Sequence, residues 1–228
     1  ANLGSFLISF KIRGYVPLMK DIKKDPKFAR ELLEFCTQVA IEYTRTLHDE
    51  LVPLGGAEPF MWGASCDVPL IGEKIFREYA LPYAAEVIKV NPYVSWGIFR
   101  FVETFGDKWP DFWEYYLKES GTPICFMYGT DTKIADLKLA KEIAKKHRRL
   151  FIVGTDAETI RYASIEELDA RIKRHIRDTA VGGGALPIKL DTVPADTPVE
   201  RFRYIVRKIK EYGTYPIDIE ALQTEDSL

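Results

Sequence analysis

The sequence has little cysteine, little excess charge and no long apolar run. Its 228 residues include three cysteines, none in a Cys-x-x-Cys pair, which argues against a disulfide framework and favours a reducing compartment such as the cytoplasm. The 32 Lys and Arg nearly balance the 34 Asp and Glu, so we expect no basic face for nucleic acid or an anionic membrane. No stretch reaches the ~18 consecutive apolar residues of a membrane-spanning helix. We therefore expect partners that are small molecules or other proteins.

Short apolar bursts alternate with longer amphipathic segments along the chain. This alternation predicts βαβ units around a parallel sheet. Strands that are apolar nearly throughout are typical of a sheet buried on both faces. The expected strands are Ser5–Phe10, Pro59–Ala64, Pro123–Tyr128, Arg149–Val153 and Ala185–Leu190.

The helices between the bursts begin at capping signals. Asp25 directly before Pro26 predicts an N-cap followed by proline at the first helical position. Ser164 and Glu167 have the spacing of a capping box, and Thr197 begins a similar signal before the last helix. We expect helices to start close to these three caps.

One segment, residues 92–116, departs from this rhythm. It follows a helix expected over residues 73–89, which Pro82 should kink or split. Ten of its 25 residues are aromatic. We interpret it as a helical insertion whose rings pack onto the body of the protein or across an oligomer interface; the alternative is a lid over a flat apolar ligand.

The residues just after the strands are the candidates for chemistry, because ligands in such folds bind beyond the carboxyl ends of the strands. Carboxylates gathered there could bind a metal, hold a cation, act as general acid and base, or cap the next helix. These candidates are Lys11, Arg13, Ser65, Cys66, Asp67, Tyr128, Thr130, Asp131, Thr155, Asp156, Lys189 and Asp191.

These candidates differ in what their positions favour. For Asp156 the helix cap is the better interpretation, whereas for Asp67 and Asp191 a cap and a functional role are both open. Cys66 is the one thiol with a functional position, since the other two cysteines fall on expected core faces. None of the three histidines is placed like a ligand or a base.

Several stretches together resemble the uroporphyrinogen decarboxylase superfamily, which also contains the corrinoid-linked methyltransferases. The resemblance implies a (β/α)8 TIM-type barrel with its site at the carboxyl ends of the strands. The stretches that carry it are Gly4–Gly14, Asp25–Thr37, Asp67–Tyr83, Leu150–Asp156 and Pro194–Pro198.

The amino-acid sequence around Asp67 is most similar to that of the methyltransferase branch. Members of that branch bind zinc through a His-x-Cys pair and a later Cys, at positions that here hold Phe126, Tyr128 and Asp191. The resemblance therefore implies a corrinoid or a corrinoid protein as a partner, but not a thiolate-rich zinc site. The tetrapyrrole-holding Tyr and His of the decarboxylase branch are not reproduced either, since the nearest positions are Phe10 and Leu190 or Asp191.

Three functions remain open. The first is a methyltransferase-like enzyme that acts on a small methylated substrate with a corrinoid. The second is a lyase of the uroporphyrinogen decarboxylase type, in which cations hold the carboxylates of a polycarboxylate substrate. The third is a non-catalytic binding or assembly subunit of the same fold. The expected catalytic residues are Asp67, Tyr128, Asp131 and Asp191, and the expected substrate contacts are Lys11, Arg13, Trp62, Cys66 and Lys189.

We expect residues 1–228 to form a single barrel domain that is incomplete or rearranged. A (β/α)8 barrel takes ~250 residues, and only five strands are expected here. The family pattern begins upstream of Ala1, and the link over residues 131–135 is short. We therefore expect more polypeptide or a partner chain to close the barrel, and an oligomer is favoured because unpaired sheet edges invite pairing.

Overall fold

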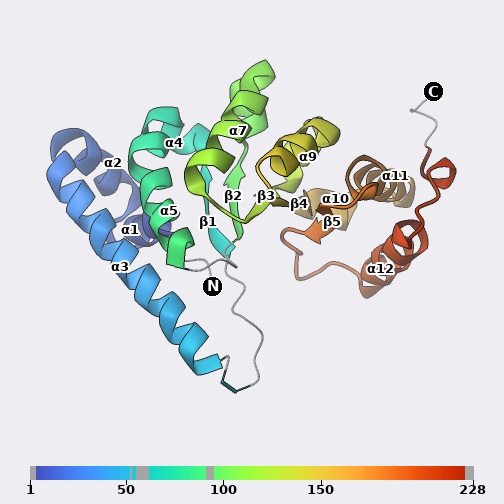
Figure 1. The fold of residues 1–228 in the computed structure, drawn as a ribbon, viewed down its shortest axis with the longest axis horizontal. Helices are drawn as coiled ribbons and strands as arrows, with labels where there is room; N and C mark the ends of the chain where they lie inside the picture. Colours follow the sequence, from blue (N-terminus) through green and yellow to red (C-terminus); the bar gives the residue numbers. More distant parts are fainter. Residues whose placement is uncertain (1–3, 52, 55–61, 91–94, 224–228) are drawn as a thin grey trace. The chain divides into compact units, whose positions relative to one another are not determined.

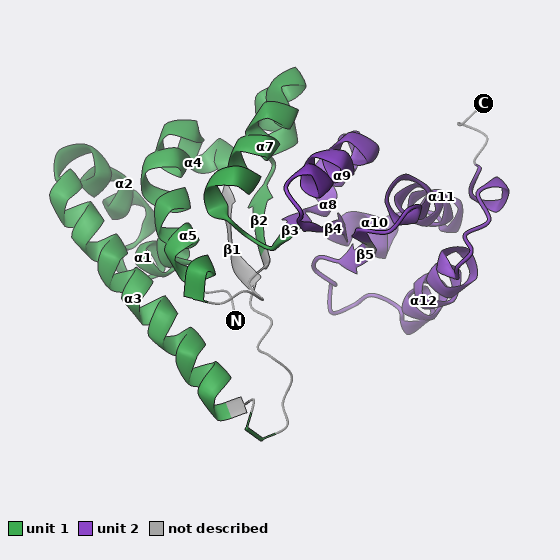
Figure 2. Ribbon diagram, in the orientation of Figure 1, with its two compact units in different colours: residues 1–125 green, residues 126–228 purple. Residues whose placement is uncertain are grey.

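The computed structural model describes residues 4–51, 53–54, 62–90 and 95–223. The chain forms two compact units, residues 1–125 and residues 126–228 (Figure 2). Helices and parallel strands alternate in both, which confirms the α/β class predicted from the sequence.

Unit 1 begins with three helices, α1 (Ser5–Arg13), α2 (Tyr15–Lys24) and the long α3 (Pro26–Leu51) (Figure 1). The prediction of a strand over residues 5–10 is wrong, because this segment is the first part of α1. A short apolar run fits a buried helix as well as a buried strand. Here the run packs against α3, where the Thr37 hydroxyl donates to Ser5 Oγ at 2.8 Å. The cap at Asp25 is confirmed, since its carboxylate accepts the Phe28 N–H at 3.1 Å.

Two strands of unit 1 pair in parallel, β1 (Trp62–Asp67) and β2 (Ser95–Phe99). Between them lie α4 (Val68–Ile75), a π-helical turn (Phe76–Ala80) and α5 (Leu81–Val90). The π-helical turn ends at Ala80, two residues before Pro82, and Leu81 keeps right-handed helical angles as α5 begins, so the helix changes its hydrogen-bond pattern near Pro82 without splitting there. The backbone departs from helical angles earlier, at Gly72 in α4. The expected strand over residues 59–64 overlaps β1 only in part, and residues 59–61 lie outside the described part of the chain.

The aromatic segment supplies the core of unit 1. It contains β2, which the sequence did not predict, then α6 (Phe101–Phe105), a short 3-10 turn (Gly106–Lys108) and α7 (Trp109–Ser120). Phe101 stacks on Trp113 with ring centroids 5.3 Å apart. The Tyr116 hydroxyl donates to the carbonyl of Trp96. All four of these rings are buried, so they serve the packing interpretation rather than a lid.

Strand β3 (Ile124–Met127) lies at the boundary between the units. Unit 2 continues with two further strands, which pair in parallel with Thr155 opposite Leu190. The capping box of Ser164 and Glu167 is confirmed at the start of α11, but the cap at Thr197 is wrong, because Pro198 is the N-cap of α12 and gives no side-chain bond. The elements are α8 (Gly129–Thr132), α9 (Leu137–Lys146), β4 (Leu150–Thr155), α10 (Ala157–Tyr162), α11 (Ile165–His175) with a π-helical end (Ile176–Ala180), β5 (Ala185–Leu190), α12 (Val199–Gly213) and a last 3-10 turn (Glu220–Leu222).

The core of unit 2 joins α11, α12 and β5. Leu168, Ile172 and Ile205 are buried in it, and Ile188 and Leu190 of β5 pack against it. Each of these side chains comes from the apolar face of its element, as helical and strand spacing require. This cluster holds β5 in place and with it the residues that follow the strand.

The described residues contain five strands, and neither unit closes a barrel by itself. Cys36 and Cys125 are buried thiols, as expected. No helix in the described ranges combines the length and the apolar character that crossing a membrane requires.

We predict that Phe101→Ala destabilises the protein by about 3–5 kcal/mol, because it empties a fully buried site against Trp113. Phe35→Ala is the matched control, since Phe35 is 61% exposed, and it should cost less than about 0.5 kcal/mol. Urea unfolding followed by tryptophan fluorescence measures both. Equal losses in the two variants would contradict the assignment of this segment to the core.

Candidate functional site

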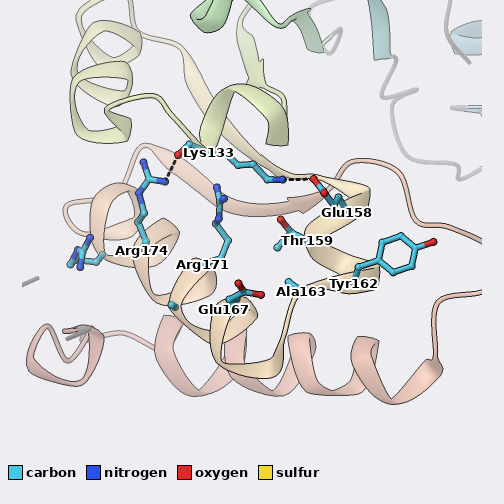
Figure 3. A pocket seen from close by; sticks show the side chains of 10 residues that line it. Lys133, Glu158, Thr159, Tyr162, Ala163, Glu167, Arg171 and Arg174 are labelled. Atoms are coloured by element: carbon cyan, nitrogen blue, oxygen red, sulfur yellow. Dashed lines mark hydrogen bonds and ion pairs between the residues drawn. The ribbon is translucent and has the colours of Figure 1, made fainter. Parts of the chain in front are cut away.

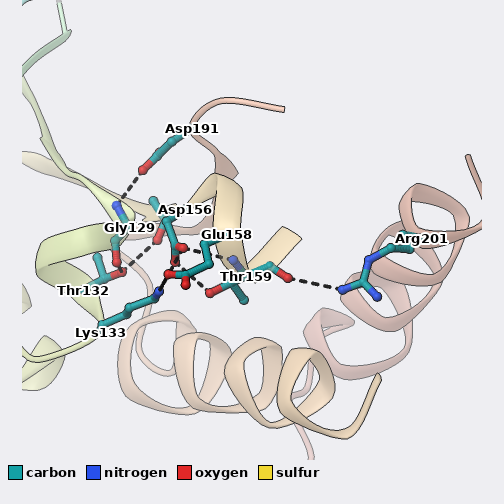
Figure 4. Close-up of polar contacts among 9 residues, drawn as sticks. Gly129, Thr132, Lys133, Asp156, Glu158, Thr159, Asp191 and Arg201 are labelled. Carbon is teal, nitrogen blue, oxygen red and sulfur yellow. Dashed lines mark hydrogen bonds and ion pairs between the residues drawn. The ribbon is translucent and has the colours of Figure 1, made fainter. Parts of the chain in front are cut away.

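The carboxyl ends of the strands in unit 2 converge on one carboxylate, that of Asp191 (Figure 4). Asp191 directly follows β5, and its Oδ2 accepts the backbone N–H of Gly129, which lies two residues after β3, at 2.5 Å. The Asp191 N–H donates to the carbonyl of Thr155 at the end of β4. Three strand ends therefore meet at this residue.

Two glycines make this approach possible. A Cβ on Gly154 would lie 2.4 Å from Asp191 Oδ1, and a Cβ on Gly129 would lie 2.1 Å from the backbone nitrogen of Asp156. Contacts this short do not occur, so any side chain at either position would displace the strand ends. The Thr132 hydroxyl fixes the same arrangement by donating to the carbonyl of Gly154 at 2.9 Å.

Asp191 is buried and incompletely satisfied. Its side chain is 8% exposed, and Oδ1 has no hydrogen-bond donor although the Lys189 ammonium lies 3.7 Å away. Burial raises the pKa of Asp191 to about 7, against the opposing effects of the Gly129 N–H and Lys189. A carboxyl group with this pKa is suited to act as a general acid or base near neutral pH.

Lys189 and two aromatic rings extend the site. The Lys189 ammonium lies 4.0 Å from the centroid of the Phe126 ring, within cation–π distance. The Phe126 ring in turn meets the Tyr128 ring edge to face at 4.5 Å. Burial lowers the pKa of Lys189, and the neighbouring Asp191 partly restores it. Tyr128, Lys189 and Asp191, all predicted as site residues, are thus brought together.

Asp156 is a helix cap, as its position favoured. Its carboxylate accepts the Thr159 N–H at 3.0 Å and the Thr159 hydroxyl at 2.8 Å, and it pairs with Lys133 at 3.0 Å (Figure 4). Burial opposes ionisation here too, but these donors outweigh it and hold the pKa of Asp156 below its usual value. Asp156 is therefore a constant negative charge beside the site.

The remaining predicted residues lie elsewhere or outside the described side chains. Asp131 is buried in α8, two residues beyond Gly129, and a catalytic role for it stays a prediction. Lys11 and Arg13 lie in the last turn of α1 rather than after a strand, and Arg13 Nε pairs with Asp21 at 2.7 Å. Lys11 and Arg13 were expected to contact the substrate because they would follow a strand, and the structure does not place them at a strand end. The side chains of Trp62, Cys66 and Asp67, on β1, lie outside the described part of the structure.

The sequence reasoning missed Gly129, Gly154 and Thr132. A glycine inside an apolar strand is a recognised signal of close backbone approach, so Gly154 could have been found. The partner that approaches it, Asp191, lies 37 positions along the chain and cannot be read from the same signal.

The donor set does not fit zinc. Phe126 offers no ligand, and Asp191 is held by Gly129 and Lys189. Within the described ranges, no three His, Cys, Asp or Glu side chains are arranged to hold a metal ion. The residues present instead bring a buried carboxyl group and an ammonium group together.

Comparison with known proteins gives one family. The family model described as uroporphyrinogen decarboxylase (URO-D) matches residues 3–212. A search of curated proteins finds no match.

We predict that Asp191→Asn stabilises the protein at alkaline pH. The pKa of Asp191 is raised on folding, so the folded state keeps a proton that the unfolded state releases, and stability falls as the pH rises from about 4 through about 7. At pH 8, Asn should exceed wild type by more than about 1.4 kcal/mol, the equivalent of one pKa unit, and the gap should shrink towards pH 4.

Urea unfolding at several pH values tests this. Asp196→Asn is the control, because the pKa of the exposed Asp196 is lowered by its hydrogen bond from Arg161. That variant should gain no stability at pH 8. If the wild-type protein is as stable as Asp191→Asn at pH 8, the ionised Asp191 carboxylate does not destabilise the folded state, and the prediction is wrong.

Proposed function

The chain belongs to the uroporphyrinogen decarboxylase family, and from this premise we propose that it is a methyltransferase-like enzyme with Asp191 as its proton donor. The single observation that carries the proposal is the buried Asp191 carboxyl group, with a pKa of about 7, at the meeting point of three strand ends. Catalytic groups in barrel folds come from such ends.

The proposed substrate is a small compound with a methyl group on oxygen or nitrogen. When the methyl group leaves, the electron pair of the broken bond stays on the heteroatom, which must take up a proton. Protonated Asp191 supplies that proton. A corrinoid, when bound, supplies the acceptor of the methyl group.

The neighbours of Asp191 favour this transfer. Once Asp191 has given up its proton, the Gly129 N–H and the Lys189 ammonium stabilise its negative charge. The Phe126 ring contacts the Lys189 ammonium at cation–π distance. Tyr128 packs against Phe126 at the end of β3, where its hydroxyl group is a candidate contact for the substrate.

A lyase is the second candidate, and the Lys189–Asp191 pair favours it. The Lys189 ammonium lies 3.7 Å from Asp191 Oδ1 and could hold a substrate carboxylate beside the proton donor. Loss of CO2 leaves the bonding electron pair on carbon, which Asp191 would then protonate. The same two residues thus serve both reactions, and the substrate distinguishes them.

Asp191→Asn should lower kcat by about 10²–10⁴-fold, because it removes the proton donor without changing the shape of the side chain. Methyl transfer to reduced cobalamin, followed by absorbance, is measured with methanol, trimethylamine and a methoxybenzoate. Release of CO2 from uroporphyrinogen is measured in parallel. Asp196→Asn, the same substitution at an exposed carboxylate paired with Arg161, should leave kcat unchanged.

The pH profile gives an independent test. Since the acid form is active, kcat should fall as the pH rises through about 7 in wild type. Activity of the Asp191→Asn variant equal to that of wild type would refute the proton-donor role. A wild-type chain inactive in both assays would favour the non-catalytic binding or assembly subunit.

A further inference from the structure

Unit 2 contains a pocket that the proposed reaction does not use. It lies along α10 and α11, reaches the π-helical end of α11, and has a volume of about 710 Å³ (Figure 3). This is within the range of about 300–1,000 Å³ that small-molecule sites occupy. Asp191 and Lys189 are not among its lining residues.

Cations dominate the lining of this pocket. Arg171 and Arg174 lie three residues apart on α11, a spacing that makes them neighbours on the helix surface, and Arg177 follows three residues later in the π-helical end. Lys133 adds a fourth cation from the end of α8. Glu158 and Glu167 are the acidic residues of the lining, so cations exceed carboxylates.

Most of these charges already have a partner in the protein. Lys133 lies 3.0 Å from Asp156 and 2.9 Å from Glu158. Glu167 accepts the backbone N–H of Ser164 at 2.8 Å in the capping box. Arg177 pairs with Asp178 at 2.9 Å. These groups shape the pocket but have little bonding capacity left for a ligand.

Arg174 is also committed. Its guanidinium donates to the carbonyls of Thr132, Lys133 and Ala135 at 3.0, 3.2 and 2.8 Å, which anchors the turn after α8 to α11. A guanidinium that serves three carbonyls is a structural clamp.

Arg171 is different. Among the residues that the structure describes, its guanidinium has no hydrogen bond and no ion pair, although the side chain is half-buried. Figure 3 shows it extending from α11 in the same direction as Arg174, towards the segment that carries Lys133. Burial and the neighbouring charge of Arg174 lower the pKa of Arg171, and the negative charge of Asp156, which forms no ion pair with it, opposes them more weakly. A partly buried cation beside another cation is costly unless an anion accompanies it.

We propose that this pocket binds a small organic anion, whose carboxylate or phosphate group accepts paired hydrogen bonds from Arg171. The planar guanidinium matches both groups, since each presents two oxygens at the spacing of its N–H donors. The volume of the pocket leaves room for the rest of such a molecule over Tyr162 and Ala163. The inference goes beyond the proposed function and does not depend on Asp191.

Titration calorimetry of the full chain with inorganic phosphate and, separately, with citrate tests the proposal. We expect binding of at least one anion in wild type and a loss of about tenfold or more in affinity for Arg171→Gln. Arg171→Lys keeps the charge but not the paired donors and should bind with intermediate affinity. Arg45→Gln, which removes an exposed arginine paired with Glu42 in unit 1, should bind as wild type does. Whichever probe binds more tightly identifies the group that the pocket prefers.

Thermal unfolding accompanies each titration. Arg171→Gln removes no bond within the protein, so it should unfold at or above the wild-type temperature, and a loss of binding then reports on the pocket. Wild type that binds neither anion, or Arg171→Gln that binds as tightly as wild type, would overturn the proposal. A loss of affinity of equal size in Arg45→Gln would also overturn it, because it would show an effect of net charge alone.

Discussion

The hydrogen bond from the Gly129 N–H to the carboxylate of Asp191 is the contact on which the candidate site depends. It ties the segment after β3 to the end of β5 across 62 positions of the sequence. It forms only because Gly154 lacks a side chain where the carboxylate lies. Lys189, two residues earlier on β5, lies near the same carboxylate. This hydrogen bond lowers the pKa of Asp191 and burial raises it, and burial prevails.

Two aspartates at neighbouring strand ends show how the surroundings decide what a carboxylate does. Asp156 accepts two hydrogen bonds from Thr159 and pairs with Lys133, so it stays ionised. Asp191 has one backbone donor and a more distant lysine, so burial prevails and its pKa rises to about 7. A pair of carboxyl groups with opposite pKa shifts is the usual basis for assigning acid and base roles. Here it separates Asp156, which caps a helix, from Asp191, the proposed proton donor.

Helix α11 shows the same division among arginines. Arg174 uses its donors to hold three carbonyls of the turn after α8, whereas Arg171, one turn earlier, has none of these contacts. The clamp at Arg174 helps to form the wall of the pocket into which Arg171 extends. Among the described residues, Arg174 is thus bonded within the protein and Arg171 is not, and the two positive charges lie close enough to repel each other.

The sequence by itself determined the α/β class, the family, β4, β5 and the helix starts at Asp25 and Ser164, because apolar spacing and caps act within a few residues. It also placed Tyr128, Lys189 and Asp191 at strand ends. It did not separate the helix over residues 5–10 from a strand, nor find β2 among the aromatics, since a short apolar run suits either element until its packing partners are known. Only the tertiary structure decided that Gly129 and Gly154 admit Asp191, and that Arg171 lacks the partners of Arg174. Burial and the supply of hydrogen-bond partners depend on segments that lie far apart in the chain. These two factors set the pKa of Asp191, and they decide whether an arginine such as Arg171 finds a partner among the described residues.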